Sequence, residues 1–413
     1  MPLGATWLMM SVEGPFLSAL IARLDEPKFN LAAYGVAFAL ALIIEAPVIL
    51  MMSASTALVK DSHSFHKLRR FTFLLSGGLT LIMVILVIPF IFYFIAEDLI
   101  GLPVKVAELT HIATIILLPW PGAIGYRRFC QGILIRNNMT RRVAYGTIVR
   151  LVTMTLTAVL LFTLTNVPGV VVGASALSMA VVAEAVASRL MTAGIIKKIS
   201  RIPSLNGKMT YTEIFHFYYP LALTSLLSMG VQPLVTFFVG KSVMALESLA
   251  VLPVVTSFVF IFRAFGLSYQ EVIIAKMDMH KLNFIPLRNY AFILAGSLSA
   301  ILFIIAFSPL SGIWFENVSG LSETLSNFSK APLQIMAIIP ALTVWISFQR
   351  AMLVNDKSTS TITRGTAIEF ITITIVMYLT VNIFQLNGAV SATTSFIIGR
   401  LAANFYFNRY VKL

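Results

Sequence analysis

Charged residues are scarce in this chain. Asp, Glu, Lys and Arg together make up 11% of its 413 residues, while hydrophobic residues make up 58%, and a soluble domain is about a quarter charged. The mean hydropathy is +0.90. This composition excludes a soluble globular protein and indicates a membrane protein.

Cysteines and catalytic motifs are also missing. Cys130 is the only cysteine, which excludes a disulfide framework and a thiolate metal site. The sequence has no P-loop, HExxH or GxSxG motif, and His63 and His66 fall in a basic break where solvated histidines are the ordinary case. We therefore expect neither an enzyme nor an ATP-driven pump, and no cofactor or resident metal.

Long apolar stretches dominate what is present. Each membrane-spanning helix needs about 20 mostly apolar residues, and such stretches recur, as at 71–96, 147–167 and 284–307. The first stretch, 3–20, lacks a basic leader and contains Glu13, so we interpret it as a permanent helix. The pattern predicts an all-α polytopic membrane protein with about twelve transmembrane helices.

Basic residues alternate along the chain. The net charge is +13, and Lys and Arg gather in every second polar break, as the positive-inside rule predicts. These breaks are 60–70, 136–142, 197–208, 276–288, 357–364 and 409–412. We therefore expect a multi-pass protein of the plasma (bacterial inner) membrane with both termini cytoplasmic, and no nucleic-acid partner.

The two halves of the chain are similar. Residues 2–24 align with 220–242 without a gap, and 121–150 align with 340–369. A repeat with an even number of helices relates the halves by an axis along the membrane normal and places a cavity between them.

The repeat sets the domain division. We predict an N-terminal six-helix lobe at 1–199, a polar cytoplasmic linker at 200–212, and a C-terminal six-helix lobe at 213–413.

Several polar and charged residues fall inside the predicted spans, where charges are costly and therefore suggest function. Guanidiniums bind carboxylates and phosphates through paired hydrogen bonds, so the arginines predict a cavity for an anion. Arg127 and Arg128 project about 100° apart on a helix, so one is expected to line the cavity and the other to reach toward the cytoplasmic surface. The predicted substrate-binding residues are Arg127, Arg128, Gln131, Arg150, Arg263 and Arg350.

Intramembrane glutamates are candidates for ion coupling or gating: Glu13, Glu45, Glu184 and Glu369. The repeat places Glu45 opposite Arg263, and Arg150 opposite Glu369. These residues then form ion pairs across the cleft that close it in one state, or they pair within a lobe and hold helices together.

Three segments, PLGATW…AAYGVAFAL, FHFYYPLALTSLL…LAVL and CQGILIRNNMT, resemble the progressive ankylosis protein family of the MOP superfamily, which also contains MATE exporters and lipid II flippases. The resemblance implies twelve helices in two pseudo-symmetric six-helix lobes and export of a small organic anion such as citrate or a nucleotide. Val12-Glu13 is similar to the first helix of MATE exporters, which implies a proton or sodium ion at Glu13 and an organic cation as solute.

We therefore expect a monomeric secondary transporter that exports a small organic anion by alternating access of two lobes around a central cleft. Its partners are the solute, membrane lipid and a coupling proton or sodium ion. The alternatives are a MATE-like proton- or sodium-coupled exporter of organic cations and a flippase for a lipid-linked substrate.

Overall fold

The apolar stretches form α-helices. The computed structural model describes residues 2–203, 209–277, 283–356 and 358–411, so Asn206 and Gly207 of the predicted linker lie outside the described residues. The first half contains α1 (Pro2–Ser11), α2 (Glu13–Ile21), α3 (Pro27–Ile49), α4 (Met51–Leu58), α5 (Ser62–Leu86), α6 (Pro89–Tyr93), the π-helical η1 (Phe94–Leu99), α7 (Val104–Ile116), α8 (Trp120–Arg136), α9 (Thr140–Leu164) and α10 (Gly169–Ile199). The second contains α11 (Tyr211–Met229), α12 (Val231–Gly240), α13 (Ala245–Lys276), α14 (Phe284–Phe307), α15 (Leu310–Gly312), the π-helical η2 (Ile313–Val318), α16 (Glu323–Met336), α17 (Ile339–Asn355), α18 (Thr359–Tyr378), the π-helical η3 (Leu379–Ile383) and α19 (Gly388–Asn408).

The described residues contain up to ten of the roughly twelve predicted spans by length and composition. Nine helices are long and apolar enough to cross a membrane, and the pair α7 and α8, bent by 42°, is a tenth. The shorter apolar helix Thr6–Ile21 and the 21-residue α19 do not meet the same length and hydropathy criteria, but they lie at the two remaining predicted positions. The first span is interrupted at Val12, three residues before Pro15, just as the seventh is interrupted at Gly230, three residues before Pro233.

Unusual backbone geometry recurs in the two halves. Glu26 and Met244 have positive φ angles of 51° and 54°, and each precedes the second span of its half. Gly101 and Gly320 have φ angles of 84° and 73°, and each follows a π-helical turn. Positive φ is uncommon outside glycine, so matching positions indicate that the halves repeat one architecture.

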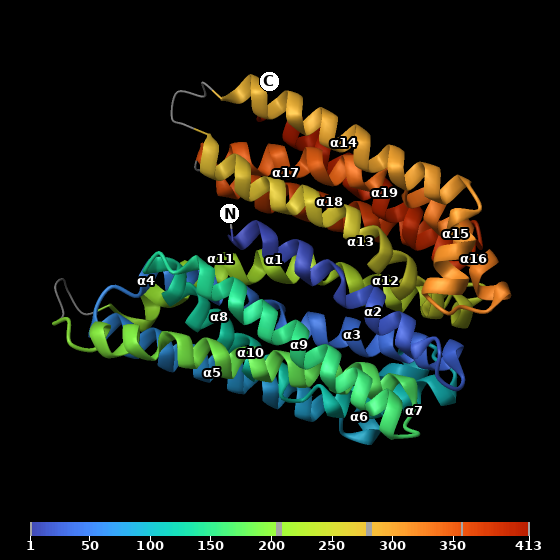
Figure 1. Ribbon diagram of the computed structural model, residues 1–413, viewed down its shortest axis with the longest axis horizontal. Helices are drawn as coiled ribbons and strands as arrows, with labels where there is room; N and C mark the ends of the chain where they lie inside the picture. The colour runs from blue at the N-terminus through green and yellow to red at the C-terminus, as the bar shows by residue number, and fades with distance from the viewer. Residues whose placement is uncertain (1, 204–208, 278–282, 357, 412–413) are drawn as a thin grey trace.

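Figure 1 shows two groups of helices, with α13 to α19 in one and α3 to α10 in the other. The first span of each half lies between the groups. α1 contacts α13 as well as α9, and α11 contacts α3 as well as α18. We refer to the group α3 to α10 as the first lobe and to the group α13 to α19 as the second lobe.

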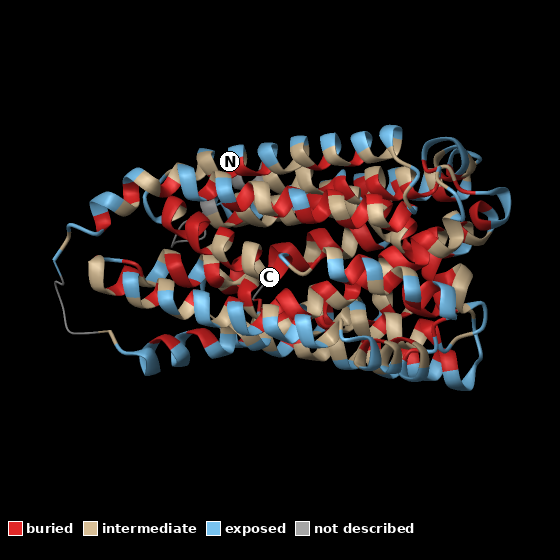
Figure 2. Ribbon diagram, turned by 90° about the horizontal axis from the view of Figure 1, so that it is seen from below, coloured by how far each residue is buried: buried red, intermediate tan, exposed pale blue. Residues whose placement is uncertain are grey.

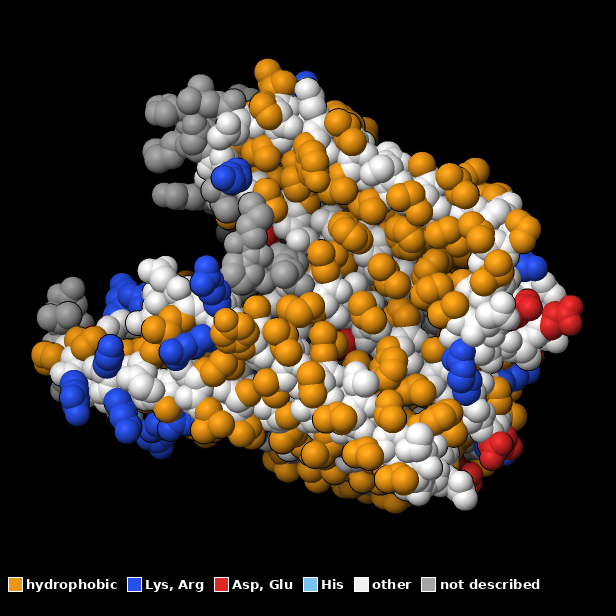
Figure 3. Space-filling view, in the orientation of Figure 1, with side chains coloured by type: hydrophobic (Ala, Val, Ile, Leu, Met, Phe, Trp, Pro, Cys, Tyr) orange, Lys and Arg blue, Asp and Glu red, His pale blue; other side chains and the backbone are white. Residues whose placement is uncertain are grey.

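The outer helices expose apolar side chains. Phe90 is 85% exposed, Leu164 74% and Ile293 68%. Figure 2 shows exposed residues along the outer helices and buried residues between them, and Figure 3 shows that the outer surface is largely hydrophobic. A surface of this kind is stable only against lipid, so the chain is an integral, multi-pass membrane protein.

The two ends of the molecule differ in charge. Lys and Arg gather where α8 and α10 end and α5 begins, which we call the basic end (Figure 3). Acidic and basic residues mix at the opposite, mixed end, where α2, η1 and α12 end. The molecular surface is hollowed between the lobes at the basic end (Figure 3).

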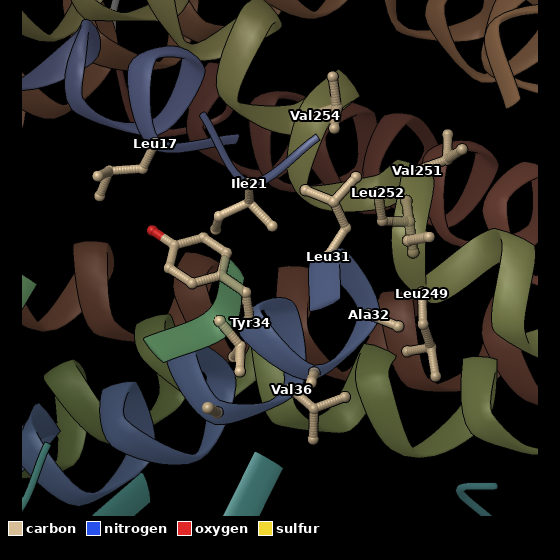
Figure 4. Close-up of a cluster of buried hydrophobic side chains, with 14 of the residues drawn as sticks. Leu17, Ile21, Leu31, Ala32, Tyr34, Val36, Leu249, Val251, Leu252 and Val254 are labelled. Carbon is tan, nitrogen blue, oxygen red and sulfur yellow. The ribbon is translucent and has the colours of Figure 1, made fainter. Parts of the chain in front are cut away.

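The lobes meet near the mixed end through a buried apolar cluster. Figure 4 shows Leu17 and Ile21 of α2 and Leu31 of α3 facing Leu252 and Val254 of α13. All five are at least 90% buried. Small residues allow the approach, since a Cβ added to Gly35 would lie 2.7 Å from Pro253 Cγ.

Polar contacts reinforce this closed end. Arg23 Nη2 donates to the carbonyl oxygens of Asn317 and Val318, at 2.8 Å each. These oxygens end η2 of the second lobe and have few other partners available at a helix terminus. Lys28 Nζ lies 2.6 Å from Glu247 Oε1 and forms a second link between the lobes.

A packing test follows from the contact of α4 with α8. A Cβ at Gly132 would overlap Ser55 Oγ and Met52 O, whereas a Cβ at Gly194 meets nothing within 4 Å. We expect Gly132→Leu to destabilise the protein by about 1–3 kcal/mol or more, as overpacking does. Thermal unfolding in detergent should show a lowered Tm for Gly132→Leu and no comparable change for the matched control Gly194→Leu.

Candidate functional site

A cavity of about 160 Å³ lies within the second lobe. Spans seven, eight, ten, eleven and twelve contribute to it, and we call it the second-lobe cavity. Its lining residues are Ser228, Val231, Gln232, Thr256, Arg263, Met336, Ile339, Arg350, Thr366, Glu369, Ile373, Phe396 and Arg400.

Helical spacing brings these side chains to the cavity. Thr366, Glu369 and Ile373 are three and four residues apart on α18, so they share one face. Arg400 reaches this face from α19 because Gly399 lets the two helices approach. A Cβ at Gly399 would lie 2.5 Å from Ile373 Cγ1 and 3.2 Å from the carbonyl oxygen of Glu369.

The cavity carries excess positive charge. Arg400 Nε lies 3.0 Å from Glu369 Oε1, and Arg350 Nη2 lies 3.7 Å from Glu369 Oε2. Arg350 Nη2 also donates to Thr366 Oγ1 at 3.3 Å. Three arginines therefore face one carboxylate, which leaves a net charge of two positive units, since a guanidinium stays charged in proteins.

Arg263 is the cavity cation that forms no ion pair with a described residue, although its guanidinium lies 5.9 Å from the centre of the Phe260 ring. In the described part of the chain its side chain makes no hydrogen bond or ion pair, and its buried Nε has no acceptor. The Nε of Arg350 is also buried without an acceptor. Buried donors normally find partners, so these two donors mark space where an anion can bind.

The other candidate charges predicted from the sequence form a first-lobe cluster. Glu184 is 1% exposed and pairs with Arg127, and it accepts a hydrogen bond from Gln131 Nε2 at 3.0 Å. Arg150 Nη2 donates to Glu13 Oε2 at 2.6 Å. Arg128 and Glu45 interact electrostatically with the other charges of this cluster. Its three arginines, Arg127, Arg128 and Arg150, are thus balanced by three glutamates, Glu13, Glu45 and Glu184.

Two members of this cluster are loosely held. Arg128 Nη1 lies 3.5 Å from Gln131 Oε1, and its buried Nε has no acceptor. Glu45 is 4% exposed and makes no hydrogen bond or ion pair with any described residue. The expectation that Arg127 or Arg128 extends to the surface is wrong, because both guanidiniums stay in the cluster.

The expected ion pairs across the cleft are not formed. Arg150 pairs with Glu13 rather than Glu369, and no described contact joins Glu45 to Arg263. The repeat places equivalent residues of the two lobes at the same depth in the membrane, but it does not make their side chains point toward each other. Arg150 and Glu369 instead pair with residues of their own lobes, which lowers the cost of desolvation, whereas Glu45 and Arg263 form no ion pair with a described residue.

The six predicted substrate-binding residues therefore lie in two separate places. Arg127, Arg128, Gln131 and Arg150 lie in the first-lobe cluster, and Arg263 and Arg350 line the second-lobe cavity. Sequence reasoning missed Arg400, although it is the only charged residue in 388–408 and the cost of a charge in a span identifies it. No three His, Cys, Asp or Glu among the described residues are placed to hold a metal.

No protein-family model and no curated protein sequence matches the chain. Solved structures match its fold. A multidrug resistance MATE family transporter of the MOP superfamily, in an inward-facing conformation, has a TM-score of 0.76 at 14% identity, over 98% of this chain and 93% of that one. The lipid II flippase MurJ, in an inward closed conformation, has a TM-score of 0.70 at 17% identity, over 98% of this chain and 87% of that one.

A third structure is a MOP superfamily transporter from Pyrococcus furiosus, with a TM-score of 0.63 at 13% identity over 99% of this chain and 93% of that one. All three similarities extend over nearly the whole chain. The protein therefore has the MOP transporter fold, and within it the two-lobe arrangement of the MATE structures.

Proposed function

We propose that the protein is a secondary transporter that binds a small organic anion in the second-lobe cavity. The observation that carries this proposal is the excess of two positive charges there, with unpartnered donors on Arg263 and Arg350. An anion with two carboxylates neutralises this excess and supplies the missing acceptors. Preorganised guanidiniums suit carboxylate recognition because of their fixed geometry.

The size of the cavity favours one class of anion. Pockets for drug-sized ligands measure about 300–1,000 Å³, and this cavity measures about 160 Å³. A citrate-sized carboxylate fits such a volume better than a nucleotide. Phe396, Ile373 and Ile339 supply an apolar wall for the carbon skeleton.

The neighbours support transport as the general function. Their titles describe multidrug resistance transporters and a lipid II flippase, and that of the Pyrococcus furiosus protein states that reverse polarity of its binding pocket suggests a different function. A change of pocket polarity within this fold agrees with an anion as cargo here. We propose no catalytic activity.

Alternating access follows from the two-lobe shape. The lobes meet at the mixed end and the surface is hollowed at the basic end, in keeping with the inward-facing neighbour. By the positive-inside rule the basic end is cytoplasmic. We propose a monomer in a bacterial inner membrane with both termini cytoplasmic, with lobes at 1–199 and 213–413 joined by a linker at 200–212.

A MATE-like exporter of organic cations is the second candidate. It draws support from the multidrug resistance neighbour and from Glu45, a buried carboxylate without a partner that can take a proton or cation. The pairing of Glu13 with Arg150 weighs against it, because the carboxylate is already neutralised. A lipid-linked flippase has support only from the MurJ fold.

Transport in proteoliposomes separates these candidates. Labelled citrate, ATP and a lipophilic cation would be offered under proton, sodium and null gradients, with protein-free liposomes as the blank. We expect saturable citrate flux and little ATP flux. Flux of the lipophilic cation alone, abolished by Glu13→Gln, would support the second candidate and overturn the first.

The closed end gives a test of alternating access. Arg23→Ala removes two charge-assisted hydrogen bonds to the second lobe, each worth about 1.5–3 kcal/mol. We expect the state open at the mixed end to rise at least tenfold in population. Nitroxide labels at Val104→Cys and Leu310→Cys in a Cys130→Ser background would measure the distance between the lobes.

The repeat supplies a matched control. Lys241 aligns with Arg23, but its ammonium stacks on Phe237 of its own lobe at 4.3 Å. Lys241→Ala should leave the distance distribution unchanged. Equal distributions for Arg23→Ala and the unmodified protein would show that these contacts do not hold the end closed.

A further inference from the structure

Glu369 occupies the position where a substrate carboxylate should bind. Its two oxygens face different guanidiniums, with Oε1 3.0 Å from Arg400 Nε and Oε2 3.7 Å from Arg350 Nη2. The side chain is 8% exposed and lines the cavity. A carboxylate of the protein thus already uses two of the three cationic groups.

We propose that Glu369 is a built-in competitor of the transported anion, a role that rests on the function proposed above. The incoming carboxylate first meets Arg263, which forms no ion pair with a described residue, and then shares or takes Arg350 and Arg400 from Glu369. Binding is thereby kept weak enough for release, which a transporter requires as much as binding.

The contacts of Glu369 distinguish competition from simple bracing of helices. The contact with Arg350 is long, at 3.7 Å, and Arg350 also bonds Thr366 Oγ1, so Arg350 can leave Glu369 without losing every partner. Arg350 Nε points into buried space without an acceptor. The other charges in the lining are Arg263 and Arg400, and α11 and α12 contribute the uncharged Ser228, Val231 and Gln232.

The two lobes differ on this point. In the first lobe each of the carboxylates of Glu13 and Glu184 is matched by an arginine, and the cluster is balanced overall. In the lining of the second-lobe cavity the single carboxylate, Glu369, faces three arginines. Removing the negative charge of Glu369 raises the excess from two to three positive charges, so it should strengthen anion binding.

Binding of labelled citrate to the purified full-length protein tests this role. Glu369→Gln keeps the shape and removes the charge, and we expect citrate to bind on the order of tenfold more tightly, a factor that corresponds to about 1.4 kcal/mol. In proteoliposomes the KM for citrate should fall, and the maximal rate should fall as well because release is slowed. Glu323→Gln, at an exposed carboxylate outside the cavity, is the matched control.

The outcomes separate this inference from the proposed function. If the unmodified protein binds citrate and Glu369→Gln binds it equally or more weakly, Glu369 is a structural residue and the inference fails. If the unmodified protein binds no citrate, the proposed function fails instead. Should Glu369→Gln not fold, Glu369→Asp withdraws the carboxylate by one methylene and should also tighten binding, although less.

Discussion

Replacing Arg263 by glutamine is expected to reduce citrate transport by about 10- to 100-fold. A hydrogen bond to a charged group contributes about 1.5–3 kcal/mol, and Arg263 forms no hydrogen bond or ion pair with a described residue that would compete with the anion. The loss should appear as a raised KM with a smaller change in maximal rate, because the interaction is made when the anion binds. Initial rates of labelled citrate uptake over a range of concentrations measure it.

A second cation of the same lobe serves as the control. Arg288 lies over the ring of Phe284 at 5.7 Å, outside the cavity. Arg288→Gln removes the same charge from the lobe and should leave the KM unchanged. A similar loss in both variants would point to the overall charge of the lobe rather than to a site at Arg263.

Replacing Glu184 by leucine is expected to destabilise the protein by about 3–5 kcal/mol, which is the usual cost of breaking a buried ion pair by removing one partner. Glu184 is 1% exposed, and its loss leaves the buried Arg127 and Gln131 without their acceptor. Thermal unfolding in detergent should show a strongly lowered Tm and reduced yield.

Removing both partners should restore much of this stability. In the double variant Arg127→Met/Glu184→Leu no charge of the pair remains buried, and apolar replacements of buried pairs are often neutral. A double variant as unstable as Glu184→Leu alone would mean that the helices depend on these side chains for something other than charge balance.

The fold could be predicted from the sequence because the bilayer allows few solutions. Apolar stretches of spanning length must be helices there, and the alignment of 2–24 with 220–242 indicated two related halves. The break at Val12 lies three residues before Pro15, and a proline inside a span removes a backbone hydrogen bond and permits a kink. The seventh span, which is related to the first by the repeat, breaks at the equivalent position, Gly230, so the break is a feature of the repeated architecture.

The site was predictable in residue type but not in arrangement. A charge inside a span can be recognised from sequence, and every candidate lies in one of the two groups of charges. The partners of each charged residue depend on how its helix is rotated about its own axis. The alignment of the two halves does not contain that information. Arg150 and Glu369 are equivalent in the repeat, yet each turns to partners in its own lobe.

The division into a balanced cluster and a positive cavity has a consequence for specificity. The alignment pairs Glu45 with Arg263 and Arg150 with Glu369, so the sign of the charge is reversed at equivalent positions. Two copies of one architecture thus provide different electrostatic environments. We interpret the second lobe as the anion-binding half, while the first lobe holds Glu13, Glu45 and Glu184, three of the four glutamates predicted for ion coupling or gating.

Equilibrium binding to the purified protein tests the central claim most directly. Labelled citrate would be competed with other small dicarboxylates, with ATP and with a lipophilic cation, in the unmodified protein and in Arg263→Gln and Arg400→Gln. We predict that citrate binds, that small dicarboxylates displace it, that the cation does not, and that both substitutions weaken it at least tenfold. Binding of the cation without binding of citrate, or citrate binding unaffected by both substitutions, would contradict an anion site in the second-lobe cavity.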